Sequence, residues 1–350
     1  MPLYRYLCVA STVVAVVWAP KLAAAADAKS AASQTAALLD EDFFLQGEYA
    51  GTIVADGVPA WTGLQVVALG NGDFQAVEYA GGLPGNGWDM RTRRKYTGRK
   101  SSGGKVELAG STGRFVVFKG AAAAVDAQGK SLGRLKKFQR VSQTLRAAPP
   151  PGALVLFSGR DARQFKSGIV TPDHLLVAGA ETNKAFQDFT LHLEFRTPYM
   201  AAAREQGRGN SGVYIQGRYE VQILDSFGLE GADNECGGLY KQRAPLLNMC
   251  FPPLSWQTYD IDFTAPRFDA SGKKTQNARI TVRHNGIVIH KDAPLTAKTG
   301  GGAQEGPDAR PLLLQDHGNL VHFRNIWLVE RPAAAYSQAG VWSAGCSLCP

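Results

Sequence analysis

The sequence predicts an all-β protein with two domains. Short apolar runs alternate with polar residues, and long amphipathic helical patterns are scarce. The 39 glycines and 18 prolines are spread along the chain, as expected for many turns. A length of 350 residues also exceeds the roughly 250 to 300 residues at which single cores stop growing, so we expect two cores.

The N-terminus predicts an export signal at residues 1–26. Arg5 precedes an apolar run at residues 7–19, and residues 21–26 supply the small side chains that signal peptidase accepts. The run is too short for a membrane-spanning helix, which needs about 20 residues. We therefore expect a periplasmic or extracellular protein without a transmembrane span, in which an alanine-rich leader at residues 27–46 precedes the fold.

A small all-β accessory domain is predicted at residues 47–145. Turn signals separate its expected strands, which are residues 49–55, 64–69, 74–79, 105–108, 114–119 and 135–141. The glycine-rich loop at residues 81–89 holds Trp88, which we expect to pack over the domain edge; the alternative is an exposed ring that stacks on a sugar. The proline-rich residues 146–152 then predict a stiff linker between the two domains.

The second predicted domain, at residues 153–331, contains more and longer strands. They are expected at residues 154–157, 174–177, 189–196, 256–263, 278–284, 287–291, 312–315 and 322–329. Asn285-Gly286 is a typical two-residue hairpin turn between two of them. In residues 189–196 the alternation places His192 and Glu194 opposite the apolar face, so we expect both side chains to be solvated.

Residues 208–226 predict the central feature of this domain, two strands joined at Gly217. Tyr214 lies on the polar face of the first strand, and Glu220 and Gln222 lie on that of the second.

 Each strand also carries an apolar face that can join a core. A carboxylate, an amide and an aromatic hydroxyl on one sheet face are groups that recognise a polyhydroxylated ligand, so Glu220 and Gln222 predict a carbohydrate groove.

The segment GNSGVYIQGRYEVQILDS, residues 209–226, resembles the central motif of the 3-keto-disaccharide hydrolase family. The similarity covers about residues 153–330 and continues in order through residues 186–196, 256–261, 265–269, 277–282, 314–319 and 323–327. This resemblance implies a concanavalin A-like β-jelly-roll sandwich that acts on 3-keto-glycosides or 3-keto-disaccharides. Cys236 and Met249-Cys250 depart from the family pattern, which leaves the shape of the long loop at residues 227–253 open.

The same strand argues against direct retaining hydrolysis. Jelly-roll glycosidases with paired acids carry a Glu-x-Asp-x-x-Glu strand whose carboxyl groups lie about 5 to 5.5 Å apart. Here Gln222 stands in the middle position and the second glutamate is missing. The substrates implied by the resemblance offer another route, because a 3-keto group acidifies the neighbouring C2 hydrogen. One base could then drive elimination across C1 and C2, and water could add back.

The predicted site follows from this chemistry. The catalytic candidates are Glu220 as base, His317 as its acid/base partner and Lys241 for the oxyanion. The substrate-binding candidates are Arg208, Tyr214, Gln222, Asp225, Tyr240, Gln315 and Arg324, the last also a candidate for the oxyanion. Two structural alternatives remain open: His317 could belong to a turn capped by Asp316 and Asn319, and Arg324 could pair with Glu194 or Asp316. No ligand spacing demands a metal, and the sequence requires no cofactor.

Removal of the signal would leave four cysteines, which allow three disulfide connectivities in an oxidising compartment. We favour Cys236 with Cys250, and Cys346 with Cys349, because each pair is close in sequence. The spacing of the first pair disfavours a four-cysteine zinc site. The second pair lies in a cysteine-containing tail at residues 332–350, to which we assign no function.

Charge and composition narrow the function classes. The net charge of +8 is modest, and the basic clusters at residues 91–95 and 134–137 lack the helical or aromatic setting of a nucleic-acid module. We therefore expect a carbohydrate partner and no nucleic acid, while the sequence identifies no protein partner. Two rival functions remain: a noncatalytic, lectin-like carbohydrate-binding module, and a structural or adhesion protein of the cell surface.

Overall fold

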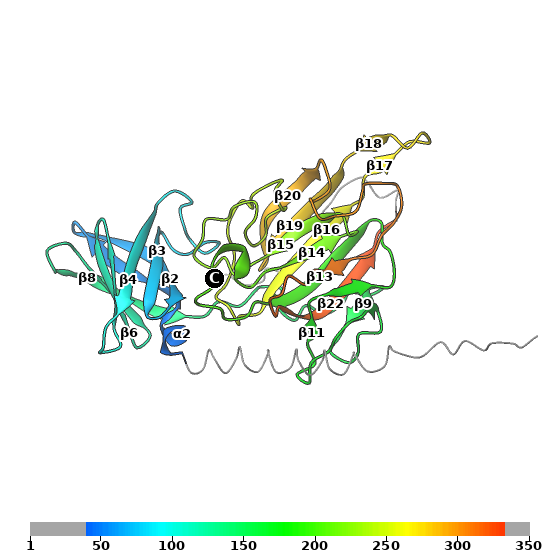
Figure 1. The fold of residues 1–350 in the computed structure, drawn as a ribbon. Helices are drawn as coiled ribbons and strands as arrows, with labels where there is room; N and C mark the ends of the chain where they lie inside the picture. The colour runs from blue at the N-terminus through cyan, green and yellow to red at the C-terminus, as the bar shows by residue number, and fades with distance from the viewer. Residues whose placement is uncertain (1–39, 333–350) are drawn as a thin grey trace, which may run out of the picture.

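The computed structural model describes residues 40–332 (Figure 1). The predicted export signal, nearly all of the leader and the pair Cys346 and Cys349 lie outside the described residues. Within residues 40–332, no helix has the length and apolar character needed to cross a membrane. The described chain forms a β-barrel followed by a β-sandwich.

The N-terminal part is a closed antiparallel barrel in which each strand pairs with the next and β8 returns to pair with β1. A short helix, α2 (Glu41–Leu45), precedes it and is capped by the Asp40 side chain. The strands are β1 (Gly47–Ala55), β2 (Val58–Gly70), β3 (Asp73–Ala80), β4 (Arg93–Lys100), β5 (Val106–Gly110), β6 (Gly113–Phe118), β7 (Ala121–Val125) and β8 (Ser131–Phe138). Closure leaves no open sheet edge.

Two barrel strands were not predicted by the sequence pattern. Residues 93–95 of the basic cluster at residues 91–95 form the start of β4, and the alanine-rich β7 has few of the residue types that favour strands. Both strands form because the barrel pairs them on each side. Trp88 packs over the domain edge as expected: its ring lies edge-on to Tyr79, and its Nε1 donates to the Thr92 carbonyl at 2.9 Å.

The C-terminal part is an all-β jelly-roll sandwich, as predicted. Its five-stranded sheet has the order β10 (Phe165–Lys166), β12 (Ala180–Thr182), β21 (Leu313–Leu314), β14 (Ser211–Ile215) and β15 (Tyr219–Ile223). The larger sheet has the order β11 (Leu176–Val177), β22 (His322–Glu330), β13 (Phe189–Arg196), β16 (Gln257–Thr264), β19 (Ala278–His284) and β20 (Ile287–Leu295), and β9 (Leu154–Phe157) also pairs with β22.

The remaining short elements are the hairpin β17 (Arg267–Phe268) and β18 (Lys274–Gln276), and the 3-10 helix η1 (Glu205–Gly207). The apolar faces of the two large sheets meet in one core, to which Leu191 and Ile261 contribute from one sheet and Val213 and Val221 from the other. This packing leaves the opposite face of β14 and β15 for polar side chains.

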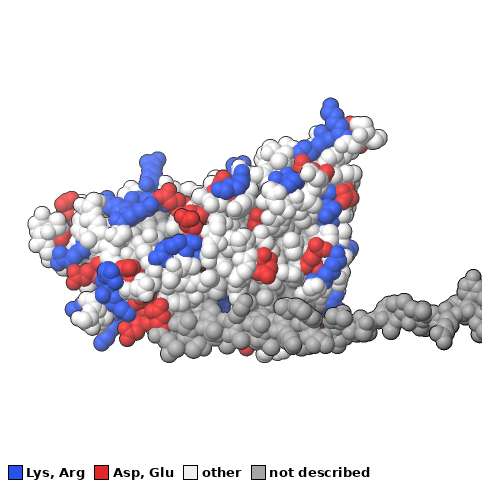
Figure 2. All heavy atoms as spheres, in the orientation of Figure 1, with Lys and Arg blue, Asp and Glu red and all other residues white. Residues whose placement is uncertain are grey.

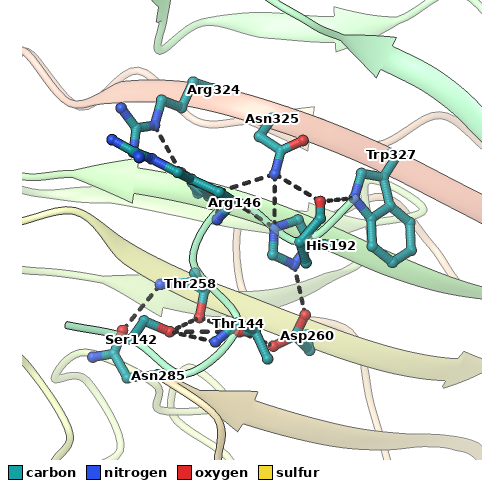
Figure 3. Close-up of polar contacts among 12 residues, drawn as sticks. Ser142, Thr144, Arg146, His192, Thr258, Asp260, Asn285, Arg324, Asn325 and Trp327 are labelled. Carbon is teal, nitrogen blue, oxygen red and sulfur yellow. Dashed lines mark hydrogen bonds and ion pairs between the residues drawn. The ribbon is translucent and has the colours of Figure 1, made fainter. Parts of the chain in front are cut away.

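The start of the linker and the residues just before it, from Ser142 on, cover the outer face of the larger sheet (Figure 3). The Arg146 N–H donates to Glu194 at 2.5 Å, and the Thr144 hydroxyl donates to Asp260 at 2.6 Å. His192 Nδ1 lies 2.6 Å from Asp260. The expectation that His192 and Glu194 are solvated was therefore wrong, since both side chains are fully buried beneath the linker.

The barrel and the sandwich share buried contacts. Val67 from β2 belongs to the sandwich core, whereas Tyr199 and Ala201 from the sandwich join the barrel core. Arg93 and Lys95 of the barrel both pair with Glu230 of the long sandwich loop. On the face shown in Figure 2, basic and acidic side chains are interspersed over both parts. That face carries no extended basic stripe of the kind that binds nucleic acid.

Candidate functional site

The hairpin β14–β15 places three of the predicted site residues on one face. Tyr214 pairs with Glu220, and Gly212 pairs with Gln222, across the two antiparallel strands. Because directly opposed residues point to the same side of a sheet, these side chains lie opposite Val213 and Val221, which are in the core. The turn has positive φ at both Gln216 and Gly217, 54° and 59°, which returns the chain tightly enough to set this register.

Glu220 has an environment unlike that of the other buried acids. Eight carboxylates are buried within residues 40–332. Seven of these eight pair with a cationic group of the described chain, namely Asp42, Glu48, Glu78, Asp188, Glu194 and Asp225 with arginine or lysine, and Asp260 with histidine. The eighth, Glu220, is 4% exposed and forms no ion pair with a described residue.

Burial without a cation changes the acidity of Glu220. It raises the pKa of the Glu220 carboxyl from 4.5 to about 7, and a hydrogen bond with Tyr214 opposes the rise. A carboxyl group with this pKa can hold or release a proton near neutral pH, as a general base or acid must. The pKa of Tyr214 is raised by burial and by the Glu220 charge, so its hydroxyl remains a hydrogen-bond donor.

Gly212 makes room for the Glu220 carboxylate. A Cβ at position 212 would lie 2.2 Å from Glu220 Oε1, far inside van der Waals contact. The backbone of Glu220 is fixed as well, since its N–H donates to the Thr299 hydroxyl at 2.9 Å and its carbonyl accepts from Tyr240 N–H at 3.1 Å. Because Gly212 on the neighbouring strand has no side chain, the Glu220 carboxylate can occupy the space beside it.

Three amide side chains extend the polar face beside Glu220. Gln222 Nε2 donates to Gln206 Oε1 at 2.9 Å, and Asn210 Nδ2 donates to the Gln206 carbonyl at 2.8 Å. Gln206 in turn donates to the Asn234 carbonyl, which links the cluster to the long loop. Sequence reasoning identified Gln222 but missed Gln206 and Asn210. Asn210 lies inside the GNSG motif and was the one signal available, whereas Gln206 lies in a loop without a pattern.

Tyr240 and Lys241 lie in the loop that borders the hairpin. The backbone bond from Tyr240 to Glu220 brings this tyrosine to the predicted site. The Lys241 side chain instead extends into solvent, where its Nζ lies 3.6 Å from Asp233 and above the Tyr240 ring. The structure thus pairs the Lys241 ammonium with Asp233 and not with the Glu220 carboxylate.

Gln315 reaches the site, but His317 does not contact its carboxylate. Gln315 N–H donates to the Gly212 carbonyl at 2.8 Å, and its buried Oε1 has no hydrogen-bond partner among the described residues. His317 lies in an exposed turn, where Asp316 accepts from the Gly318 N–H at 2.8 Å. Asn319 accepts from Asn210 N–H. The turn alternative accounts for this geometry, and the predicted contact between His317 and Glu220 is absent.

Arg208 and Asp225 form a buried ion pair instead of facing a sugar. Arg208 Nε donates to Asp225 at 2.7 Å, and its Nη1 donates to the carbonyls of Ala68 in the barrel and Ala201 in the sandwich. Burial raises the pKa of Asp225, although the Arg208 guanidinium opposes this. The substrate-binding prediction for these two residues is corrected: the five-residue offset from Glu220 turns Asp225 inward, where the pair joins the barrel to the sandwich.

Arg324 lies on the larger sheet, away from the β14–β15 face. Its Nε donates to Glu194 at 2.7 Å, and its guanidinium lies 3.9 Å from the centroid of the Trp256 ring. The structural pairing with Glu194 is therefore the alternative that the structure shows. An oxyanion or sugar role for Arg324 at Glu220 is corrected, because the two residues belong to different sheets of the sandwich.

The cysteines of the long loop are free thiols. Cys236 and Cys250 are both buried, so the disulfide predicted between them is absent from the structure. Cys236 Sγ lies 3.3 Å from the Tyr259 hydroxyl, and Cys250 Sγ lies 3.5 Å from the Leu224 carbonyl. Hydrogen bonds and burial fix these side chains without a covalent link. No group of three or more His, Cys, Asp or Glu residues within residues 40–332 is arranged to hold a metal ion.

Solved structures with similarity to this chain come from Parabacteroides distasonis and are described as candidate glycosyl hydrolases. The first is 33% identical with a TM-score of 0.49, and the match covers 52% of this chain and 85% of that chain. The second is 18% identical with a TM-score of 0.39, covering 52% and 94%. The third is 19% identical with a TM-score of 0.37, covering 51% and 99%. A comparison with curated proteins gave no significant match.

A family comparison matches the sandwich together with the site. The model of the 3-keto-alpha-glucoside-1,2-lyase-like domain matches residues 152–329, slightly more than half of the chain. This range contains both large sheets, the β14–β15 hairpin and the loops around Glu220. The chain therefore belongs to the family of 3-keto-alpha-glucoside-1,2-lyase-like domains.

Proposed function

We propose that this protein is a glycoside-cleaving enzyme that acts on 3-keto-glycosides, with Glu220 as its base. The observation that carries the proposal is the buried Glu220 carboxylate, which has no cationic partner among the described residues and a pKa of about 7. Strongly perturbed pKa values of this kind gather at functional sites. The family match supports the substrate class, since the family description names a 3-keto-α-glucoside.

In the proposed reaction, Glu220 removes the proton from C2 of the keto sugar. The electron pair of the C2–H bond moves toward the C3 carbonyl to give an enolate. Its return forms a double bond between C1 and C2 and breaks the bond from C1 to the leaving oxygen, which takes up a proton. Water then adds across the double bond, with hydroxide at C1 and a proton at C2, so the net change is hydrolysis.

This route needs one carboxylate, in agreement with the site. A retaining glycosidase would need a second carboxyl group at about 5 to 5.5 Å, but Asp225 is committed to Arg208 in the interior. Tyr214 provides a hydroxyl donor beside Glu220, and an enolate is stabilised by such preorganised donors. Gln222 and the unpartnered Gln315 Oε1 are the proposed contacts for sugar hydroxyls.

The first experiment measures sugar release from a panel of 3-keto-glucosides and the matching unoxidised glucosides. We expect wild type to cleave only the keto substrates and Glu220→Gln to lose this activity, while the matched change Glu107→Gln on the exposed surface of the barrel leaves it intact. Wild type that is folded but cleaves no keto substrate would refute the proposal and favour a lectin-like module.

A second measurement tests the mechanism. In heavy water, elimination followed by hydration should place deuterium at C2 of the released keto sugar, because the C2 proton is exchanged during turnover. Direct displacement at C1 leaves that hydrogen in place. Cleavage at full rate without deuterium at C2, after correction for exchange in the absence of enzyme, would exclude Glu220 as the C2 base.

We also propose that the protein is exported. The pattern at residues 1–26, with Arg5 before a short apolar run, supports removal of the segment by signal peptidase. Mass spectrometry of the mature protein from the periplasm or the medium should show an N-terminus near residue 27. An intact N-terminal methionine on protein found only in the cytoplasm would contradict export.

A further inference from the structure

A pocket of about 210 Å³ lies where the barrel meets the sandwich. The barrel supplies α2, the start of β1 and the end of β8 with the residues after it, and the sandwich supplies the loop at residues 252–255. The pocket is separate from the β14–β15 face and includes none of the residues assigned above to the proposed reaction. The lining residues on which the following argument rests are Phe44, Gln46, Lys137, Phe138, Arg140 and Leu254.

Gln46 brings an unused hydrogen-bond donor to this pocket. Its side chain is 2% exposed, and its Oε1 accepts from Ala68 N–H at 3.3 Å. Its Nε2 is buried and has no partner among the described residues. Leaving a buried donor unpaired is unfavourable, because the group loses its hydrogen bond to water. The cost is removed if a ligand in the pocket offers an oxygen to Nε2.

Charged side chains add further donors. Arg140 holds Glu48 with two nitrogens, at 2.7 and 2.5 Å, so this guanidinium is neutralised within the pocket. Lys137 Nζ donates to the Phe44 carbonyl at 2.6 Å and forms no ion pair with a described residue. An ammonium group has three N–H bonds, so Lys137 retains capacity to donate to an oxygen of a ligand.

Aromatic rings at the pocket remain open to solvent. Phe44 is 52% exposed and Phe138 is 36% exposed, although both side chains are large and apolar. Exposed aromatic faces beside convergent polar groups are typical of ligand sites. Such rings can pack against the C–H face of a sugar while its hydroxyl groups reach the donors.

The sandwich side of the pocket is built from a strained residue. Leu254 has a φ of 65°, which is rare for a bulky side chain, and its N–H donates to the Thr197 carbonyl at 3.0 Å. It packs against the barrel core from the opposite domain. Strain of this kind persists where the surroundings hold it and is frequent at ligand clamps. The wall is thus fixed in place before any ligand arrives.

We propose that this interdomain pocket binds a single pyranose unit of a glycan. Phe44 and Phe138 would contact the apolar face of the ring, and Gln46 and Lys137 would donate to its oxygens. The volume of about 210 Å³ is below the roughly 300 to 1,000 Å³ of sites for larger ligands, which limits the occupant to one ring. The barrel then serves as an accessory carbohydrate-binding part, whether or not Glu220 is catalytic.

The test uses the full-length mature protein and ligand-observed saturation-transfer NMR. The probes are the methyl α- and β-glucopyranosides, methyl α-mannopyranoside and methyl α-galactopyranoside. The pocket variants are Phe44→Ala, at an exposed position, and Gln46→Leu. Trp61→Ala, which removes another exposed aromatic ring from the barrel, is the matched control. The same series is repeated in Glu220→Gln, and thermal unfolding confirms that each variant is folded.

We expect at least one glycoside to bind, and both pocket variants to weaken that binding about tenfold, as a loss of 1.4 kcal/mol would produce. Trp61→Ala should bind like wild type, and the effect should persist in Glu220→Gln. Equal affinity in both folded pocket variants and the control, or no binding of any probe to wild type, would overturn the proposal. Failure of the enzyme proposal would look different, since keto-glycoside cleavage would be missing while binding stayed sensitive to Phe44 and Gln46.

Discussion

Replacing Gly212 by alanine should disable the site without unfolding the protein. A Cβ at this position would lie 2.2 Å from Glu220 Oε1, whereas ordinary contact begins at 3.4 Å. The carboxylate must therefore move by about 1.2 Å, the difference between these distances. The φ of Gly212 lies outside the left-handed region, so alanine adds no backbone strain. The nearest atoms all belong to the Glu220 side chain, whose Cγ and Cδ would also lie 3.0 Å from the new Cβ, so the clash is relieved if this side chain moves.

The magnitude follows from this displacement. A misplacement of about 1 Å at a reacting group can lower the rate about 100-fold. Stability should change little, since alanine in place of glycine at a compatible position gains about 0.4 to 1 kcal/mol by restricting the unfolded chain. We therefore expect kcat/KM on a 3-keto-glucoside to fall about 100-fold, with a Tm close to that of wild type.

The assay is initial-rate sugar release, paired with thermal unfolding of the same samples. Gly300→Ala is the matched control, because a Cβ there meets no atom within 4 Å and φ is again outside the left-handed region. It lies next to Thr299, which accepts a hydrogen bond from the Glu220 backbone. Full activity of a folded Gly212→Ala variant would refute the placement of the reacting carboxylate beside this glycine.

Four further predictions concern buried charges. In the proposed reaction the ionised form of Glu220 is the base, so kcat/KM should fall as the pH drops through about 7. Folding raises this pKa from 4.5 to about 7, so protonation of the carboxyl stabilises the folded state. As the pH rises from 4.5 to 8 this stabilisation is lost, and the free energy of unfolding of wild type should fall by about 3 kcal/mol relative to that of Glu220→Gln. Chemical denaturation at each pH measures the difference. Asp225→Asn leaves the Arg208 guanidinium buried without its countercharge and should lower the free energy of unfolding by about 3 to 5 kcal/mol. Asp260→Asn removes a charged partner of His192 and of the linker, and denaturation should show a loss of about 1.5 to 3 kcal/mol.

Each of these predictions has a control and a result that contradicts it. A pH profile of kcat/KM that stays flat between pH 5 and 8 would exclude Glu220 as the ionising base. Parallel stability curves for wild type and Glu220→Gln would contradict its raised pKa. For the two aspartates, the exposed Asp56→Asn in the barrel is the matched change. Losses no larger than in this control would show that the ion pairs contribute little to folding.

The hairpin could be predicted from sequence because its signals are local. Residues 211–215 and 219–223 alternate between apolar and polar side chains, and Gly217 allows the turn between them. Since a strand has a period of two, one apolar face settles where Tyr214, Glu220 and Gln222 point. This local rule placed three site residues correctly on one face, and the antiparallel register follows from the short turn.

The same rule failed where another segment covers the polar face. His192 and Glu194 lie opposite the core, as the alternation requires, but residues 142–147, which lead into the linker, bury both of them. Alternation assigns a side chain to a face and carries no information about what packs on that face. Arg324 illustrates the consequence, because its partner Glu194 comes from a neighbouring strand 130 positions away in sequence.

Glu220 differs from the other buried acids because it is buried and yet has no cationic partner among the described residues. Neither its burial nor its lack of a partner can be read from the sequence. An arginine near an acid in sequence is a poor guide: Arg218 is two residues from Glu220 but pairs with Asp308. Burying an ionised carboxylate without a countercharge is so unfavourable that the group instead shifts its pKa. A fold selected for stability alone would pair this acid, as it pairs the other seven buried carboxylates of the described chain, or replace it by an apolar residue. The unpaired state of Glu220 is therefore a reason to assign it a reaction, and the pH dependence of kcat/KM measures the property that the burial creates.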